Sequence, residues 1–382
     1  MALLLNEEQQ LLKDTAKEFV QKNAPISHFR ELRDTQDEIG YSLDLWKQMV
    51  ALGWAGILIP EEYGGSDFGM VGLGAILEET GKNLVPSPLF ATALVGASLI
   101  QIAGNEKQKK EILPKIAEGK LSTAFAIEES ARHDPFNIST SCTHKGGKMI
   151  LEGKKTFVLD GHTADLLIVV ARHTQPSSGK DISKEGLGLY LVDPDLEGVS
   201  RTRMNMVDSR NACEIKFNKV QVPEGNQLGE QEAGGIIEEV LERAQIGISA
   251  EMLGSTIQTF DITLNYLKER KQFGRAIGSF QALQHRAAQM FAEIELSKSS
   301  VLGALNAVDK NSNDRSRFAS LAKFKTSETF RLVSSEAVQM HGGVGVTDEF
   351  DIGFFLKRSR VAEQIFGSSD YHLDKYASLS EY

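Results

Sequence analysis

The stretch from Tyr266 to His285 reads Tyr-Leu-Lys-Glu-Arg-Lys-Gln-Phe-Gly-Arg-Ala-Ile-Gly-Ser-Phe-Gln-Ala-Leu-Gln-His and interrupts a helical pattern with two glycines. Apolar residues stand at helical spacing before and after it, so the sequence predicts a helix that reaches Lys271, pauses and restarts near Ser279. Helix ends expose backbone N–H groups, and a helix N-terminus carries partial positive charge. Beside Arg270, such groups would attract a phosphate or an electron-rich ring. A simple helix-helix elbow would produce the same pattern.

A second glycine-rich element, Gln339-Met-His-Gly-Gly-Val-Gly345, interrupts the helical pattern closer to the C-terminus. Three glycines in four residues let a ligand approach the backbone closely. A helix C-cap followed by a tight turn would also explain Gly342 and Gly343. It would not explain why both elements occur in one chain.

Both elements resemble the flavin-contacting motifs of the acyl-CoA dehydrogenase family, in which Arg-x-x-Phe-Gly with a later Gln, and Gln-x-x-Gly-Gly-x-Gly, recur. The resemblance covers essentially the whole chain, including Pro60-Glu-Glu-Tyr-Gly-Gly65. It implies FAD as cofactor and an acyl-CoA as substrate, with the second element receiving the ADP half of a neighbouring subunit's flavin. The implied flavin contacts are Phe157, Arg270, Gln272, Phe273, Ile277, Phe280, Gln281, Gln339, Met340, Gly342, Gly343 and Ser368.

The order of periodicities along the chain predicts an α+β protein. Residues 6 to about 118 show helical patterns, and Asn6 is suited to cap the first helix. From Ser122 the chain changes to short β-branched and apolar runs at 123–127, 149–151, 166–170, 187–192 and 213–220. Helical periodicity returns after Gly235. We expect a helical domain over 1–120, a β-barrel or β-sandwich over 121–231, and a four-helix bundle over 232–382, which the resemblance implies assembles into a tetramer.

Composition excludes several classes of protein. The 382 residues are 41% hydrophobic and 25% charged, with a net charge of -10, which indicates an acidic multidomain globular protein and disfavours a nucleic-acid partner. The longest apolar run, Leu166 to Ala171, is far shorter than the roughly 20 residues of a membrane span. We therefore expect a cytoplasmic protein. Cys142 and Cys213 lack metal-ligand spacing and predict inert, buried thiols rather than a metal site. No P-loop, dinucleotide fingerprint or hydrolase elbow occurs.

The implied reaction removes a proton beside a thioester while hydride leaves the next carbon for flavin, giving a trans-2-enoyl-CoA. In most of the family the base is the Glu of a Tyr-Glu-Gly-Thr element, but here that stretch is Ile365-Phe-Gly-Ser368, and Phe366 cannot take a proton. Some members place a base Glu before an Arg on an earlier helix, which Glu242 and Arg243 match. We predict Glu242 as base, with Arg243, Ile365 and Phe366 contacting substrate. Alternatively, Glu242 belongs to a solvated acidic turn with Glu238 and Glu239.

Other positions depart from the common pattern. The family's Trp-x-Thr-Asn-Gly appears as Phe157-Val-Leu-Asp-Gly161, and its Thr-Glu-Pro-Gly-x-Gly-Ser-Asp loop as residues 128–134, without the glycines. With these departures, the chain resembles the smaller subunit of heteromeric pimeloyl-CoA and steroid side-chain acyl-CoA dehydrogenases. Two hypotheses follow: a homo-oligomeric dehydrogenase passing electrons to an electron-transfer flavoprotein, or a heterotetramer's partner subunit with little chemistry of its own. The small-subunit likeness hints at a branched, alicyclic or steroid acyl group. An acyl-CoA oxidase or a non-CoA flavoprotein is a third reading.

Overall fold

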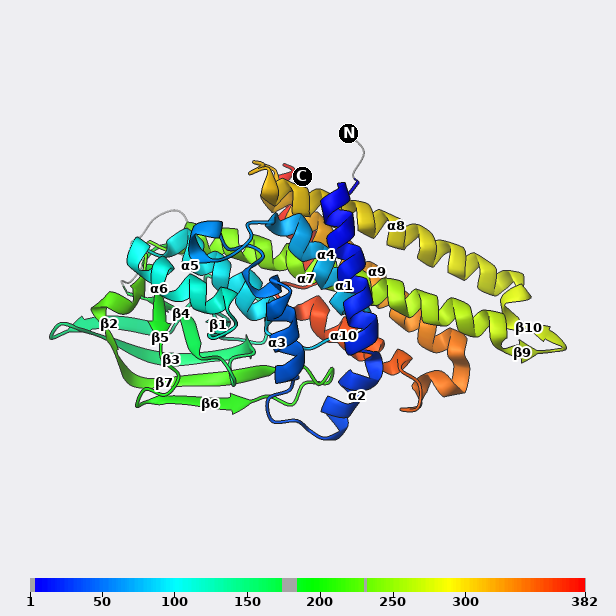
Figure 1. The fold of residues 1–382 in the computed structure, drawn as a ribbon, viewed down its shortest axis with the longest axis horizontal. Helices are drawn as coiled ribbons and strands as arrows, with labels where there is room; N and C mark the ends of the chain where they lie inside the picture. Colours follow the sequence, from blue (N-terminus) through cyan, green and yellow to red (C-terminus); the bar gives the residue numbers. More distant parts are fainter. Residues whose placement is uncertain (1–3, 174–183, 230–231, 382) are drawn as a thin grey trace. The chain divides into compact units, whose positions relative to one another are not determined.

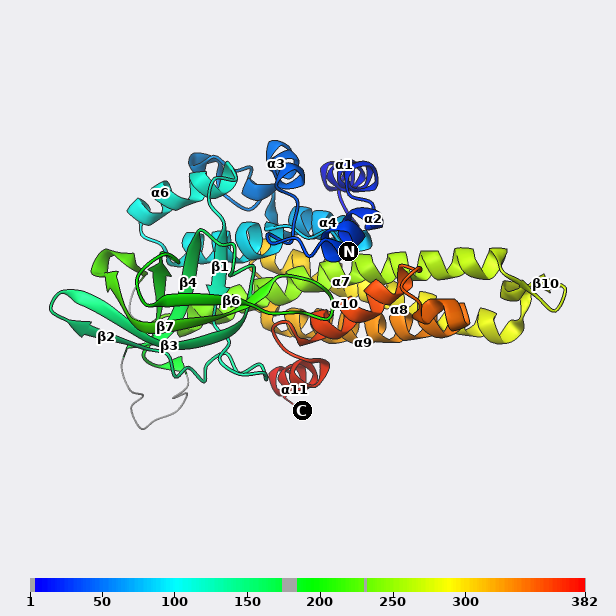
Figure 2. The same ribbon diagram turned by 90° about the horizontal axis from the view of Figure 1, so that it is seen from below.

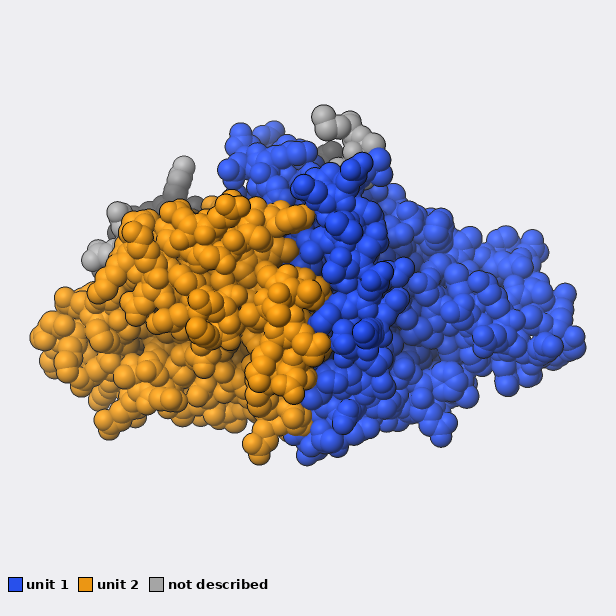
Figure 3. Space-filling model, in the orientation of Figure 1, with its two compact units in different colours: residues 1–36, 69–86, 245–382 blue, residues 37–68, 87–244 orange. Residues whose placement is uncertain are grey.

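The structure, a computed structural model, describes residues 4–173, 184–229 and 232–381 (Figure 1). The chain divides into two compact units, each assembled from segments far apart in the sequence (Figure 3). The first unit takes residues 1–36, 69–86 and 245–382, and the second takes 37–68 and 87–244. The expected boundaries at 120 and 231 therefore stay a prediction about domains, because these units follow contacts rather than sequence order.

The first unit is helical. Asn6 caps its first helix as expected, since its side chain accepts from the Gln9 N–H at 2.8 Å and the Gln9 side chain accepts from the Asn6 N–H. The long helices α8 and α9 lie side by side, and α10 and α11 pack on α9 (Figure 2). The helices are α1 (Glu7–Asn23), α2 (Ile26–Asp34), α4 (Gly69–Lys82), the C-terminal part of α7 (Gly234–Glu269), α8 (Gln281–Asp309), α9 (Arg315–His341), α10 (Ile352–Gln364) and α11 (Ser369–Leu379).

The predicted break after the long helix is present, but its backbone differs from expectation. Helix α7 ends at Glu269, and the chain then forms a small hairpin in which β9 (Lys271–Gln272) pairs antiparallel with β10 (Arg275–Ala276). A short 3-10 turn, η6 (Ile277–Ser279), leads into α8. The expectation of a cluster of free backbone donors is therefore wrong in part, because the hairpin uses several of them internally.

The second unit contains the sheet and shorter helices. Its helical segments are α3 (Leu43–Ala51), η1 (Trp54–Gly56), η2 (Glu61–Tyr63), the π-helix η3 (Leu89–Gly96), α5 (Ala97–Ala103) and α6 (Glu106–Ala117). The sheet runs in the order β6-β7-β3-β2-β4-β5-β8, with β1 parallel to β4. Strands β1 to β5 and β7 all supply residues to one buried cluster, so the sheet curves around a single core.

Each of the five predicted β runs coincides with a strand, although the first extends past its strand by Ile127. The strands are β1 (Thr123–Ala126), β3 (Lys148–Leu159), β4 (Leu166–Arg172), β5 (Leu187–Val192) and β7 (Ala212–Pro223). The sequence reasoning missed β2 (Ser141–Lys145), β6 (Val199–Arg203) and β8 (Gln227–Leu228). Strand β6 lies at a sheet edge with none of its residues fully buried, and β2 buries only Cys142. Such strands lack the apolar content on which strand prediction depends.

The structure also bears on the two cysteines and on membrane-spanning helices. Cys142 and Cys213 are buried free thiols, and burial raises the pKa of Cys213 to about 12. Among the described helices, none combines the length and the apolar character that crossing a membrane requires.

Candidate active site

Three phenylalanines predicted for the site share an unusual backbone conformation. Phe157, Phe273 and Phe366 have φ angles of 52°, 53° and 54°. A bulky side chain rarely adopts this left-handed region, because its Cβ crowds the following carbonyl oxygen. Such strain costs roughly 1–3 kcal/mol and persists mostly at ligand clamps and active sites. Eight other described residues that are not glycine also have positive φ, Leu84 among them, so this conformation does not by itself assign the three phenylalanines to a site.

Phe273 lies at the tip of the β9–β10 hairpin, with 92% of its surface exposed. Its ring meets Phe280 edge-on at 6.1 Å between centroids, and the Arg275 guanidinium lies 4.2 Å over the Phe280 ring. Arg270, Gln272 and Gln281 are exposed around the same hairpin, whereas Ile277 is partly buried against the helical core. The hairpin thus presents an aromatic ring together with cationic and amide donors.

The glycine element follows α9 directly. Gly342 ends the helix with φ 64°, and the turn η7 (Gly342–Val346) begins there, so the C-cap reading describes the local backbone correctly. Tyr266 at the end of α7 joins the two predicted elements: its ring stacks on His341 at 4.3 Å, and its hydroxyl donates to the His341 carbonyl at 3.3 Å. Met340 is buried in the cluster that also holds Ile277.

His341 is a buried histidine at the C-terminal end of α9. Its Nδ1 lies 2.7 Å from the Ala337 carbonyl oxygen, and burial lowers its pKa. Gln339, two residues earlier, is exposed. A Cβ added at Gly342 or Gly343 would meet no atom of the described residues within 4 Å, so the backbone there is open to a ligand.

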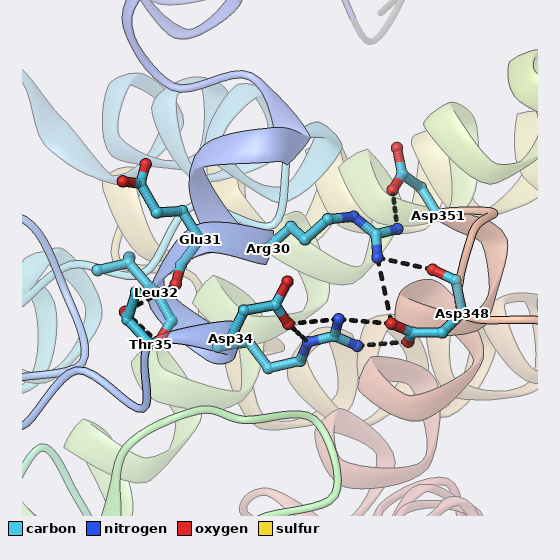
Figure 4. Close-up of polar contacts among 8 residues, drawn as sticks. Arg30, Glu31, Leu32, Asp34, Thr35, Asp348 and Asp351 are labelled. Carbon is cyan, nitrogen blue, oxygen red and sulfur yellow. Dashed lines mark hydrogen bonds and ion pairs between the residues drawn. The ribbon is translucent and has the colours of Figure 1, made fainter.

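Ionic contacts from α2 fix the segment that follows the glycine element (Figure 4). Arg33 Nη2 lies 2.7 Å from Asp348 Oδ2, and Arg30 Nη2 lies 2.6 Å from Asp351 Oδ1. Both guanidinium groups also lie within 4.7 Å of the Phe354 ring centroid. Hydrogen bonding to Arg33 holds the pKa of Asp348 below its usual range. These contacts anchor the C-terminal side of η7, while Tyr266 anchors its start.

Phe157 lies on a β-bulge in the second unit. Lys155 pairs with Ile215 and Val158 with Cys213, so two residues of β3 face one residue of β7. The unusual 128–134 loop is bonded to this bulge, because the Thr156 N–H donates to the Glu128 carbonyl at 2.8 Å. The two departures from the family pattern are therefore one connected structural feature.

Sequence reasoning missed a buried ion pair beneath this loop. Lys155 is fully buried, and its Nζ donates to Glu129 Oε1 at 2.7 Å and to the Ile127 carbonyl at 3.1 Å. Burial lowers the pKa of Lys155 to about 8. The burial of Lys155 could have been predicted from strand periodicity, because Lys155 lies on the same inward face of β3 as Met149 and Leu151.

Glu242 is 4% exposed, in the first turns of α7, with Val240 and Leu241 also buried beside it. The hypothesis of a solvated acidic turn is therefore wrong for Glu242. It fits Glu238 and Glu239 better, since these are only partly buried and pair with Lys184 at 3.1 Å and Arg243 at 2.9 Å.

Comparison with known proteins identifies the family. Residues 6–120, 124–220 and 234–378 match the N-terminal, middle and C-terminal domains of acyl-CoA dehydrogenase. The chain belongs to the acyl-CoA dehydrogenase family. It is an FAD-dependent acyl-CoA dehydrogenase with that family's three-domain α+β fold.

Named relatives align with this dehydrogenase along nearly its full length. It is 32% identical over 374 residues to the probable acyl-CoA dehydrogenase YngJ of Bacillus subtilis, covering 96% of each chain. It is 29% identical over 377 residues to CarC, a subunit of the caffeyl-CoA reductase-Etf complex of Acetobacterium woodii, again covering 96% of each. A solved structure of the Tcur3481-Tcur3483 steroid acyl-CoA dehydrogenase has a TM-score of 0.87 at 28% identity, covering 98% of both chains.

The residues of this acyl-CoA dehydrogenase fit FAD chemically. Arg270 offers a cation, Gln272 and Gln281 offer amides, and the open backbone at Gly342 and Gly343 allows close approach of a dinucleotide phosphate. FAD, when bound, supplies the acceptor for the hydride that leaves the substrate.

Proposed function

We propose that this chain converts an acyl-CoA to its trans-2-enoyl-CoA with Glu242 as the base. The carboxylate takes the proton from the carbon beside the thioester carbonyl. The hydrogen on the next carbon leaves with its electron pair for FAD, and the remaining electron pair forms the double bond. Arg243, Ile365 and Phe366 are proposed to contact the substrate, and an electron-transfer flavoprotein to reoxidise the cofactor.

The burial of Glu242 is the observation that carries this proposal. A carboxylate that is almost fully removed from water costs several kcal/mol unless it is paired or used, and catalytic carboxylates are commonly kept in such places. The neighbouring Glu238 and Glu239 are only partly buried, so Glu242 is the acidic residue of this turn that is withdrawn from water. Phe366, at the position where most relatives carry the base, has no group that could take a proton.

The test uses Glu242→Gln with Glu238→Gln as a matched control, since Glu238 pairs with Lys184 and not with Arg243. Both variants lose one carboxylate from the same helix, but only the first loses the buried one. The purified FAD-loaded proteins are mixed with acyl-CoAs without oxygen, and flavin absorbance is recorded. We expect bleaching to slow by about 100-fold or more in Glu242→Gln, since loss of a catalytic base lowers the rate roughly 10²–10⁴-fold. Comparable bleaching in both variants would show that another group is the base.

A second candidate is a partner subunit of a heteromeric enzyme. It is favoured by Phe366, by Leu159 in place of the family's Thr, and by likeness to the Tcur3481-Tcur3483 steroid enzyme, whose two chain names mark a pair. A colourless protein that acquires flavin only when produced with a second dehydrogenase-like chain would support this alternative.

For both candidate functions we propose an oligomer, a branched, alicyclic or steroid-derived acyl group as substrate, and a cytoplasmic location. CarC, by name a subunit of an Etf complex, supports the proposed electron acceptor.

A further inference from the structure

The turn that joins α10 to α11 is held by side chains from three other places in the fold. It comprises Ile365, Phe366, Gly367 and Ser368. Two consecutive residues have positive φ, with Phe366 at 54° and Gly367 at 110°. A glycine would take either conformation without strain, whereas phenylalanine does not. A turn needed only to connect two helices would have no reason to keep a bulky residue there.

Buried donors occupy the carbonyl oxygens of this turn. The Phe366 carbonyl accepts from Gln245 Nε2 at 3.2 Å and lies 3.0 Å from His372 Nε2. The Gly367 carbonyl accepts from Lys323 Nζ at 3.0 Å. Gln245, His372 and Lys323 are 1%, 0% and 0% exposed, so these bonds form away from water.

Lys323 bridges the two sides of the turn. Besides Gly367, its Nζ donates to the Glu363 carbonyl at 2.9 Å and to the Ser327 hydroxyl at 3.3 Å. Burial lowers the pKa of Lys323 to about 7. Burying an amine is unfavourable, and backbone oxygens neutralise its charge less well than a carboxylate would. The fold thus accepts both a buried lysine and a strained phenylalanine at one turn.

We propose that Lys323, Gln245 and His372 are positioning residues that fix this turn so that the Phe366 ring forms a wall of the acyl pocket and limits the bulk of the acyl group. This inference rests on the proposed function, in which Phe366 contacts the substrate. Phe366 is 9% exposed, and buried donors bond its own carbonyl and those of Glu363 and Gly367 on either side of it. Removing one of these hydrogen bonds would let the Phe366 ring shift while its own atoms stay the same.

The test compares kcat/KM for butyryl-CoA and for cyclohexanecarbonyl-CoA in four variants. Phe366→Gly should raise the ratio in favour of the ring-bearing thioester by roughly tenfold or more, since a filled pocket discriminates by about that factor. Lys323→Met should shift the ratio in the same direction while keeping the phenylalanine. Lys323→Met combined with Phe366→Gly should match Phe366→Gly alone, because no ring is left to position.

Ser334→Ala is the matched control, since Ser334 is a fully buried polar residue of the same helix whose hydroxyl bonds Ser359 at 3.0 Å, away from the turn. Its ratio should stay within about twofold of wild type. If Lys323→Met does not fold, Gln245→Met removes the hydrogen bond to the Phe366 carbonyl and keeps the lysine.

An unchanged ratio in Lys323→Met or Gln245→Met, or additive effects in the double variant, would overturn the positioning role. Dissociation constants of the two thioesters, measured by calorimetry on FAD-loaded protein, should shift in the same direction and are independent of turnover. A failure of Glu242 as the base is therefore distinguishable from a failure of this inference.

Discussion

Replacing Gly254 by alanine tests how closely α4 and α7 cross. A Cβ at Gly254 would lie 1.8 Å from the Glu78 carbonyl oxygen, and a Cβ at Gly81 would lie 2.2 Å from the Glu251 carbonyl oxygen. Both obstacles are backbone atoms, which cannot rotate away as a side chain can. The Ser255 hydroxyl donates to the Gly81 carbonyl at 2.8 Å across the same crossing. The two helices would have to separate by roughly 1.5 Å to restore ordinary contact.

Three effects determine the size of the change. Overpacking of this kind costs about 1–3 kcal/mol, and weakening the Ser255 hydrogen bond costs about 1 kcal/mol. Alanine offsets about 1 kcal/mol of this through its better helix propensity. We expect the free energy of unfolding to fall by about 1–3 kcal/mol in Gly254→Ala.

The control is the same substitution at Gly303 in α8. There an added Cβ would lie 3.6 Å from the nearest atom outside its own helix, on the Phe318 ring, which is ordinary contact. Gly303→Ala should therefore stabilise the protein by up to about 1 kcal/mol. Urea unfolding followed by circular dichroism, with FAD in excess, measures both. If Gly254→Ala were neutral or stabilising, the argument that these glycines permit a close helix crossing would be refuted.

Two further predictions concern ion pairs. Glu129→Gln should destabilise the protein by about 3–5 kcal/mol at pH 7, because it leaves the Lys155 ammonium buried without its carboxylate. That loss should shrink as the pH rises from 7 toward about 8, the lowered pKa of Lys155 in wild type, because the variant's lysine lacks Glu129 to hold its proton and is neutralised at lower pH. Between this pH and 10.5 the unfolded chain binds more protons at Lys155 than the folded one, so this group's contribution to stability rises with pH. An equal loss at pH 7 and pH 10 by urea titration would contradict this account. Asp348→Asn should speed hydrogen exchange at the amides of 342–346 several-fold at low salt, and wild type should approach the variant near 1 M NaCl, since salt screens exposed pairs. Exchange rates that do not respond to the substitution would show that Arg33 does not anchor the glycine element.

Local pattern was sufficient for much of this protein. The α, β, α order, the break after α7 and the capping by Asn6 depend on residues within a few positions of one another, and periodicity reports such relations directly. The loss of a carboxylate at Phe366 is likewise a matter of residue identity. Sequence left open whether Glu242 is buried or solvated, and the structure shows it buried beside Val240 and Leu241. Edge strand β6 was missed because it contributes little to the core, and a pattern of burial cannot reveal an element that is scarcely buried.

What surrounds the candidate site was decided by the tertiary structure. Arg33 and Asp348 are 315 residues apart, and Lys323 lies 40 residues from Glu363 and 44 from Gly367. Nothing in the neighbouring sequence of either partner specifies such a pair, because the chain must first fold to bring them together. The left-handed conformation of Phe366 has the same origin, since donors on three separate helices hold a backbone that its own residue type disfavours. The sequence alone determined which cofactor and chemistry this chain is built for, while only the packed structure determined how the residues around them are held.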